Sequence, residues 1–88
     1  MKIHFHENFN NDLSKLGDAV LAKQIKKLIL RLENMRTLSE IPNVKKMQGG
    51  PNFFRIRLGD YRVGITKEGD TITLMRVLHR KEIYRYFP

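Results

Sequence analysis

Three arginines in the second half of the chain have a spacing that suits chemistry on a phosphate group. Arg55 and Arg57 alternate within the run 53–58, and Arg62 follows after a short turn. Alternate side chains of a β-strand point to the same face, so Arg55 and Arg57 would share one face and the apolar residues between them would face the core. Arginine carries a permanent charge on a planar fork that binds phosphate oxygens through two hydrogen bonds. The spacing therefore predicts a cationic sheet face suited to a phosphate-rich ligand.

Groups that can move protons follow the next predicted strand, where His79 and Tyr84 accompany a fourth cation, Arg80. Cleavage of RNA through its own 2′-hydroxyl needs a base, an acid and fixed cations around the phosphate, and histidine titrates close to neutral pH. The candidate catalytic residues are Arg55, Arg57, Arg62, His79, Arg80 and Tyr84. Further candidates for binding RNA are Lys45, Lys46, Arg76 and Lys81.

Each candidate also has a purely structural explanation. Arg55 and Arg57 would then form the solvated face of a half-exposed strand. Arg62 would form an ion pair with Asp60 or Glu82.

The C-terminal residues have similar alternatives. His79 would only end a strand, and Tyr84 would anchor the last turn to the sheet through its ring. Tyr86 and Phe87 are expected to pack against the protein rather than to stack on bases.

The composition excludes several kinds of functional site. The chain has no cysteine, which excludes disulfides, a thiolate nucleophile and a cysteine zinc site. His4 and His6 alternate without carboxylates at ligand spacing, so we expect no metal and no other cofactor. The 88 residues predict a single domain spanning 1–88, and no apolar run resembles a signal peptide or a membrane span. We therefore expect a cytoplasmic protein that does not bind membranes.

The formal charge of +8 is concentrated where the arginines lie. Residues 45–88 hold ten Lys/Arg and four Asp/Glu, whereas residues 1–44 hold seven and five. Such basicity favours a polyanionic partner, either a nucleic acid or an acidic protein. The alternative is that the charge only aids solubility.

The first half of the chain predicts one strand and two helices. Residues 2–6 alternate as a strand, and Asn8 or Asn10 is expected to cap a short helix that ends at Gly17. Asp18 is expected to cap a longer helix, and Pro42 closes the helical region. The apolar stripe of this longer helix comprises Leu21, Ile25, Leu28, Leu32 and Met35.

The second half predicts strands joined by Gly-rich turns, and then a short helical turn over 81–87. The strands are 44–48, 53–58, 61–66 and 71–78. In 71–78, apolar residues occupy odd-numbered as well as even-numbered positions, which point to opposite faces of a strand. This pattern indicates a central strand covered on both faces. The predicted fold class is α+β, a twisted and mostly antiparallel sheet with a helical hairpin packed on one face.

Two segments resemble the RelE/ParE superfamily of bacterial and archaeal type II toxins. They are Arg-Ile-Arg-Leu-Gly-Asp-Tyr-Arg-Val at 55–63 and His-Arg-Lys-Glu-Ile-Tyr at 79–84. Length and element order are similar over the whole chain. The resemblance implies a RelE-like fold and an RNA-cleaving site. Its members would be Arg55, Arg57, Arg62, either His79 or Arg80, and Tyr84.

The chain departs from the family at the first two of these positions. The best-studied bacterial members have lysines where Arg55 and Arg57 stand. Lysine can release a proton and act as a base, whereas arginine essentially cannot. The departure shifts the expected proton transfer to His79 or Tyr84. Whether His79 or Arg80 fills the key C-terminal position stays open, because this segment varies in length within the family.

The resemblance implies three alternative functions. The first is a RelE-type toxin, an endoribonuclease that cuts messenger RNA in a ribosome-dependent way. It would be neutralised by a cognate antitoxin in a hetero-oligomer. The second is a ParE-like toxin that binds DNA gyrase and cleaves nothing. The third is a non-catalytic module that binds nucleic acid with salt-sensitive affinity.

Overall fold

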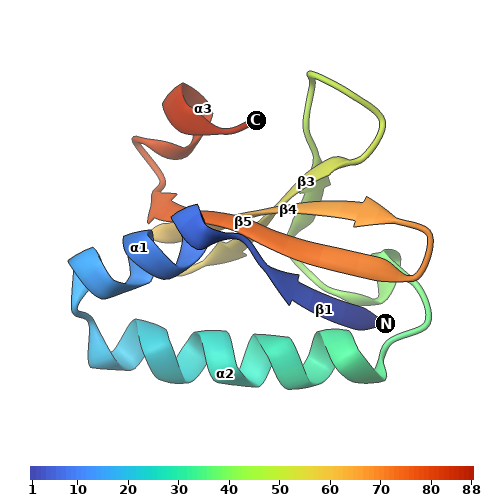
Figure 1. Cartoon of the computed structure of the whole chain (residues 1–88), viewed down its shortest axis with the longest axis horizontal. Coiled ribbons are helices and arrows are strands. Elements are labelled where there is room, and N and C mark those ends of the chain that lie inside the picture. The colour runs from blue at the N-terminus through green and yellow to red at the C-terminus, as the bar shows by residue number, and fades with distance from the viewer.

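A five-stranded sheet forms the middle layer of the protein in a computed structural model that describes residues 1–88 (Figure 1). The strands are β1 (Lys2–Phe5), β2 (Val44–Lys46), β3 (Phe53–Leu58), β4 (Tyr61–Glu68) and β5 (Thr71–His79). Their order is β1-β5-β4-β3-β2, in which only the β1–β5 pair is parallel. The predicted α+β class and the mostly antiparallel sheet are confirmed.

Two helices, α1 (Glu7–Leu16) and α2 (Ala19–Asn34), form the predicted hairpin, and α2 lies along one face of the sheet (Figure 1). Gly17 ends α1 in the left-handed conformation with φ 57°, which glycine adopts without steric cost. Asp18 caps α2 by accepting a hydrogen bond of 3.0 Å from the Leu21 N–H. The apolar stripe of α2 is buried at Leu21, Ile25, Leu28 and Leu32 and partly buried at Met35.

The expected cap of α1 is wrong. His6, and not Asn8 or Asn10, occupies the N-cap position, and its Nδ1 accepts a hydrogen bond of 3.0 Å from the Asn8 N–H. An imidazole nitrogen here replaces the carbonyl or hydroxyl oxygen that usually caps a helix. The helix therefore starts directly after β1, at Glu7.

The main core lies between the sheet and the helical hairpin. It joins Phe9 of α1 and the α2 stripe to side chains of β3, β4 and β5. The strand residues are Ile56, Val63, Ile65, Ile72, Leu74 and Val77. A 3₁₀ turn, η1 (Leu38–Glu40), connects α2 to β2 and adds Leu38 to this core.

A β-bulge in β5 explains why apolar residues occupy both parities of this strand. Ile65 pairs with Leu74 but Gly64 pairs with Arg76, so Met75 is an extra residue in β5. After the bulge Val77 returns to the main core, whereas Met75 and Leu78 face the opposite side. The interior strand is covered on both faces, as predicted.

A short helix, α3 (Ile83–Tyr86), lies on the side of the sheet opposite α2 (Figure 1). Ile83 and Phe87 form a second, smaller core there with Met47 and Phe53. The Phe53 and Phe87 rings meet edge to face, with centroids 5.7 Å apart. A Cβ on Gly64 would lie 2.6 Å from the Phe87 ring, so only glycine allows this close approach. None of the helices has the length and apolar composition needed to cross a bilayer.

Candidate functional site

The arginines of β3 and β4 lie on the sheet face that carries α3. Arg57 and Arg62 are direct cross-strand partners, and residues directly opposite one another share a face. Arg55 is two residues from Arg57 and therefore lies on the same face, while Ile56 is buried in the main core. The register thus brings the three arginines together.

Tyr84 reaches this face from α3. Its hydroxyl oxygen accepts a hydrogen bond of 3.0 Å from Arg55 Nε, and Arg55 Nη1 also donates to the Asn43 carbonyl at 3.4 Å. The Tyr84 side chain is 61% exposed, so its hydroxyl is accessible to a ligand. The C-terminal turn is anchored to the sheet by Ile83 and Phe87. The Tyr84 ring is therefore not needed as the anchor, which was the structural alternative for this residue.

Arg62 lies at the centre of this positive charge. Its Nη1 donates to the carbonyl oxygens of Gly59 and Tyr61, at 3.0 and 2.9 Å. Partial burial lowers the pKa of Arg62, and the charges of Arg55, Arg57 and Arg80 lower that pKa further, while Tyr84 opposes them. We call the four cations Arg55, Arg57, Arg62 and Arg80 the arginine cluster.

No carboxylate neutralises the arginine cluster. The one salt bridge in the chain joins Arg76 to Asp12, so the ion pair considered between Arg62 and Asp60 or Glu82 does not form. Four like charges held together without counter-charges repel one another. A polyanion that binds them relieves this repulsion.

His79 is not brought to the arginine cluster. It is the cross-strand partner of Tyr61, which packs against the main core, and the two rings meet edge to face at 5.9 Å. Its Nδ1 accepts a hydrogen bond of 3.2 Å from the Lys81 N–H. The bulge at Met75 is the cause, because it turns the side chain of every later residue of β5 to the opposite face of the sheet. His79 ends a strand and caps a turn, so the expectation that it joins the site is corrected.

Arg80 follows directly and lies with the cluster. Its charge acts on Arg62, and its backbone N–H donates to the Asp60 carbonyl at 2.8 Å, which joins this segment to the β3–β4 turn. Of the two residues considered for the key C-terminal position, the structure brings Arg80 and not His79 to the arginines.

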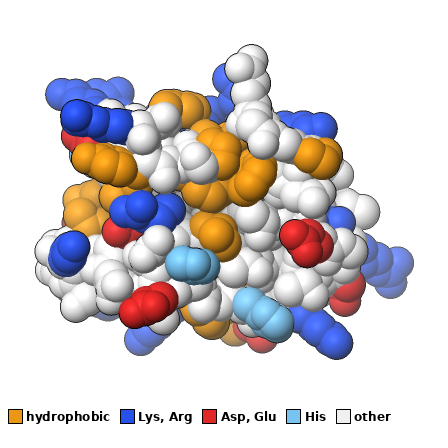
Figure 2. All heavy atoms as spheres, turned by 45° about the horizontal axis from the view of Figure 1, so that its top comes forward, with side chains coloured by type: hydrophobic (Ala, Val, Ile, Leu, Met, Phe, Trp, Pro, Cys, Tyr) orange, Lys and Arg blue, Asp and Glu red, His pale blue; other side chains and the backbone are white.

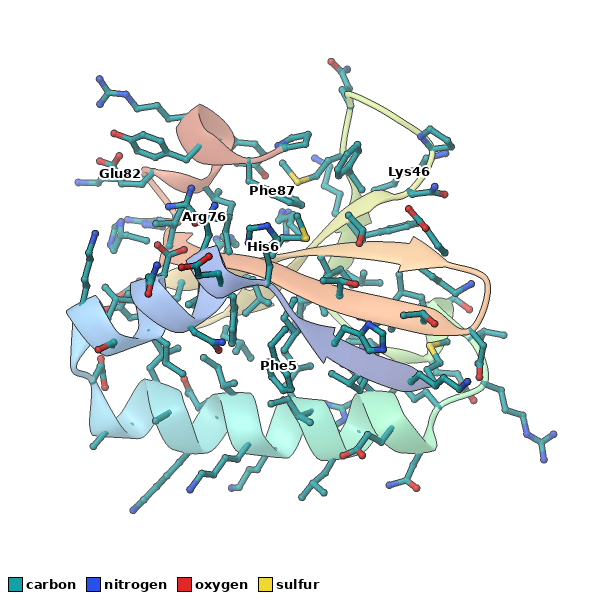
Figure 3. All side chains as sticks on the ribbon, in the orientation of Figure 1. Phe5, His6, Lys46, Arg76, Glu82 and Phe87 are labelled. Atoms are coloured by element: carbon teal, nitrogen blue, oxygen red, sulfur yellow. The ribbon has the colours of Figure 1, made fainter.

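Arg76 is held away from this site in a structural ion pair. Its Nε lies 2.7 Å from Asp12 Oδ2, and its Nη2 lies 3.0 Å from Oδ1. Asp12 is buried and also accepts the Val77 N–H at 3.2 Å. Figure 3 shows Arg76 between α1 and α3, and its guanidinium lies 5.8 Å from the centroid of the Tyr86 ring. Arg76, predicted to bind RNA, is therefore held in an ion pair with Asp12 and does not belong to the arginine cluster.

The remaining predicted cations are exposed. Lys45 is the cross-strand partner of Arg55, so it extends the cationic face onto β2. Lys46 follows it, and Lys81 lies in the turn between β5 and α3. Two residues that were not predicted from the sequence are Asn43 and Gly64, which position Arg55 and Phe87 respectively. A glycine inside a strand was the available signal for Gly64, since it often marks a close approach of another group.

An open cleft of about 390 Å³ adjoins the arginine cluster at Tyr84. We call it the C-terminal cleft, and its lining residues are Lys45, Lys46, Met47, Gln48, Tyr84, Phe87 and Pro88. No group of three or more histidine, aspartate or glutamate side chains in the chain is arranged to hold a metal ion.

Comparison with known proteins gives one consistent result. The family model of the ParE toxin of type II toxin–antitoxin systems, parDE, matches residues 3–84. Toxin RelE3 of Methanocaldococcus jannaschii is 44% identical over 89 residues, which span 100% of both chains.

Solved structures agree with this match. The crystal structure of a RelB–RelE antitoxin–toxin complex from Methanococcus jannaschii contains a chain that is 44% identical, with a TM-score of 0.81. The similarity covers 97% of this chain and 99% of that one. An archaeal RelE–RelB complex from Pyrococcus horikoshii shares the fold at 22% identity, with a TM-score of 0.74 and coverage of 93% and 97%. The chain therefore belongs to the RelE/ParE superfamily of toxins of type II toxin–antitoxin systems.

Proposed function

We propose that this toxin is an endoribonuclease that cleaves messenger RNA. One observation carries the proposal: the Tyr84 hydroxyl is held 3.0 Å from Arg55 Nε beside an arginine cluster that no carboxylate neutralises. A proton-transfer group next to fixed cations is what cleavage of a phosphodiester requires.

The proposed reaction uses the nucleophile that RNA itself carries. The 2′-hydroxyl loses its proton, and its oxygen forms a bond to the neighbouring phosphorus. The bond from phosphorus to the 5′-oxygen breaks, and that oxygen takes up a proton. The products are a 2′,3′-cyclic phosphate and a 5′-hydroxyl end, and no metal-bound water is needed as nucleophile.

The arginines would stabilise the charge that builds on the non-bridging oxygens. Arg62 is held by two backbone carbonyls, so it is already oriented before RNA binds. Arg55, Arg57 and Arg80 surround it. Because an arginine is a poor proton donor or acceptor at neutral pH, we assign proton transfer to Tyr84.

The proposal includes dependence on the ribosome. Tyr84 is the one side chain that hydrogen-bonds to the arginine cluster, whereas cleavage requires both a base and an acid. The site is an open sheet face, which does not enclose RNA or fix the in-line geometry alone. A ribosome that presents the message would supply that alignment. The proposed place of action is therefore the cytoplasm.

We also propose a cognate antitoxin as partner in a hetero-oligomer. The 44% identical relative was solved as an antitoxin–toxin complex. The charge of +8 and the exposed arginine cluster suit a partner with an acidic segment that covers this face.

A second function is kept because the matching family model is that of the ParE toxin. On this alternative the chain would bind DNA gyrase and cleave no RNA. The arginine cluster would then serve binding only, and Tyr84 would have no chemical task.

Induced expression followed by mapping of RNA 5′ ends tests the proposal. The wild-type chain should arrest growth and create new 5′ ends within coding regions. Arg62→Ala should create none, whereas Arg31→Ala should behave as the wild type, since Arg31 is an exposed arginine on α2. Growth arrest with intact messages and double-strand DNA breaks would support the gyrase alternative and contradict an endoribonuclease.

A further inference from the structure

We propose that the C-terminal cleft binds a nucleobase beside the scissile phosphate and sets which base is preferred there. This inference rests on the proposed endoribonuclease function and adds a specificity site to it. The base would belong to the same RNA strand whose phosphate lies on the arginine cluster.

The cleft has an apolar floor and a polar rim, which matches the shape and chemistry of a base. Met47 and Phe87 are buried and supply the floor together with Pro88. Lys45, Lys46, Gln48 and Tyr84 supply the rim. A base presents flat π-faces to apolar and aromatic groups and hydrogen-bonding atoms at its edge.

The polar groups of the rim are free to bind. The Gln48 side chain makes no hydrogen bond within the protein, and neither Lys45 nor Lys46 forms an ion pair. The Gln48 amide carries both a donor and an acceptor, which lets it recognise a base edge through two hydrogen bonds. The cleft is lined by no aspartate or glutamate, so a strand of phosphates meets no repulsion there.

The cleft and the arginine cluster form one continuous surface. Tyr84 lines the cleft and also contacts Arg55 at 3.0 Å. Lys45 is the cross-strand partner of Arg55, which places the rim one strand away from the cluster. A phosphate on the arginines therefore leaves the neighbouring base within reach of the cleft.

Hydrophobic side chains lie beside basic ones on part of the molecular surface. Figure 3 shows Phe87 on the side of the sheet opposite α2. Figure 2 shows hydrophobic side chains gathered around the middle of the visible face, with Lys and Arg side chains toward its margins.

The chain offers a matched control surface. A smaller hollow on α2 is lined by Gln24, Lys27, Leu28, Arg31 and Leu58, and so contains the same kinds of polar side chain. Leu28 belongs to the main core and Leu58 packs against it, so this hollow lies away from Tyr84. Gln24→Ala is the control for Gln48→Ala, and Lys27→Ala is the control for Lys46→Ala.

The first test measures binding without cleavage. Short RNAs carry one 2′-deoxynucleotide at the cleavage position, which removes the nucleophile, and 2-aminopurine at one neighbouring position at a time. Stacking in the cleft should quench the fluorescence at one position next to the cleavage site. Gln48→Ala and Lys46→Ala should weaken that quenching, whereas Gln24→Ala and Lys27→Ala should keep it.

The second test measures base preference. With messages that vary at that position, Gln48→Ala should reduce the discrimination between bases about tenfold while cleavage continues. Quenching at no single position, or equal effects of Gln48→Ala and Gln24→Ala, would overturn the inference. RNA cleavage with an unchanged preference in Gln48→Ala would leave the endoribonuclease function intact and reject only the base site. A defined quenching position, without cleavage of ribosome-bound messages by the wild type, would support the base site and reject the endoribonuclease.

Quenching that a purified antitoxin relieves while the RNA stays bound would also reject the proposal. It would assign the cleft to the antitoxin instead of to RNA.

Discussion

The contact between Tyr84 and Arg55 is the smallest unit on which the proposed chemistry depends. Arg55 Nε donates to the tyrosine hydroxyl and so fixes where this exposed group lies beside the cluster. Arg55 thereby links the face that would bind the phosphate to the side chain that would move the proton.

Tyr84→Phe removes the hydroxyl and keeps the ring. We predict that it slows the chemical step by about 10²–10⁴-fold and changes RNA affinity little, since proton transfer typically contributes that much. Single-turnover cleavage and a separate RNA-binding titration measure the two effects. His79→Ala is the control, and it should keep the parental rate because His79 lies on the other face. If His79→Ala cleaved slowly and Tyr84→Phe cleaved at the normal rate, proton transfer would have to be assigned to His79 instead of Tyr84.

Arg62→Ala removes the central cation of the cluster. We expect a loss of about a hundredfold in cleavage rate, which is typical when one group that stabilises transition-state charge is removed. Its hydrogen bonds go to the carbonyls of Gly59 in the β3–β4 turn and of Tyr61 at the start of β4, which suggests a cost of only about 1 kcal/mol in the free energy of unfolding. Urea denaturation checks the fold. If the variant were largely unfolded, its lost activity would say nothing of catalysis, and Arg62→Lys would then decide by keeping the charge.

At the scale of elements, the position of α3 decides whether Tyr84 reaches the arginines. The helix has only four residues and is held by Ile83 and Phe87 against the sheet. The Phe87 ring packs directly against Gly64, and any side chain at position 64 would occupy the space of that ring.

Gly64→Ala should therefore displace α3 without changing any arginine. Overpacking at this position is expected to cost about 1–3 kcal/mol in the free energy of unfolding. Cleavage should fall as Tyr84 moves from Arg55. In a double-mutant cycle with Phe87→Ala, the cost of Gly64→Ala should largely disappear. Equal costs with and without the Phe87 ring would show that the ring does not rest on Gly64.

The ion pair of Asp12 and Arg76 joins α1 to β5. Asp12→Ala leaves the Arg76 guanidinium and the Val77 N–H without their partner, so we predict a loss of about 3 kcal/mol in the free energy of unfolding. Arg76→Ala should likewise lower stability and barely change RNA affinity. The midpoint of urea denaturation and an RNA titration measure both. A marked drop in RNA affinity without destabilisation would restore Arg76 to the RNA-binding residues.

The elements themselves could be predicted from local patterns. The stripe of α2, the caps Gly17 and Asp18, and the alternation of Arg55 with Arg57 obey rules that operate over a few residues. The expected ends of the helices and strands differ from the structure by only a few residues.

The errors arose where distant residues decide the outcome. Simple alternation counted from Ile72 places His79 on the face opposite the main core, but the bulge at Met75 reverses the parity. Nothing in 71–78 alone marks that bulge. Arg76 likewise pairs with Asp12, which is 64 residues away in the chain. Periodicity contains no information about such a partner.

At the scale of the whole molecule, charge and size predict dependence on a partner. The chain is short, and it carries +8 with an arginine cluster that nothing neutralises. Its core consists of 13 buried residues plus a satellite cluster of 3, which limits the stability of the free protein.

A cognate antitoxin should therefore raise the melting temperature of this toxin well above that of the free protein. Any ligand that binds only the native state stabilises it, and here the binding would also relieve the repulsion within the arginine cluster. Calorimetry of the toxin with and without saturating antitoxin measures the shift, which should shrink as salt is added. Equal melting temperatures would contradict binding to the folded toxin.

In the proposed reaction, the 2′-hydroxyl of RNA attacks the phosphate on the arginine cluster. The most direct measurement uses a message, bound to ribosomes, that carries a single 2′-deoxynucleotide at the mapped cleavage position. The all-RNA message should be cut to a 2′,3′-cyclic phosphate and a 5′-hydroxyl end, and the substituted message should not be cut at that position. Cleavage of both messages at the same rate, or a 5′-phosphate on the product, would contradict attack by the 2′-hydroxyl.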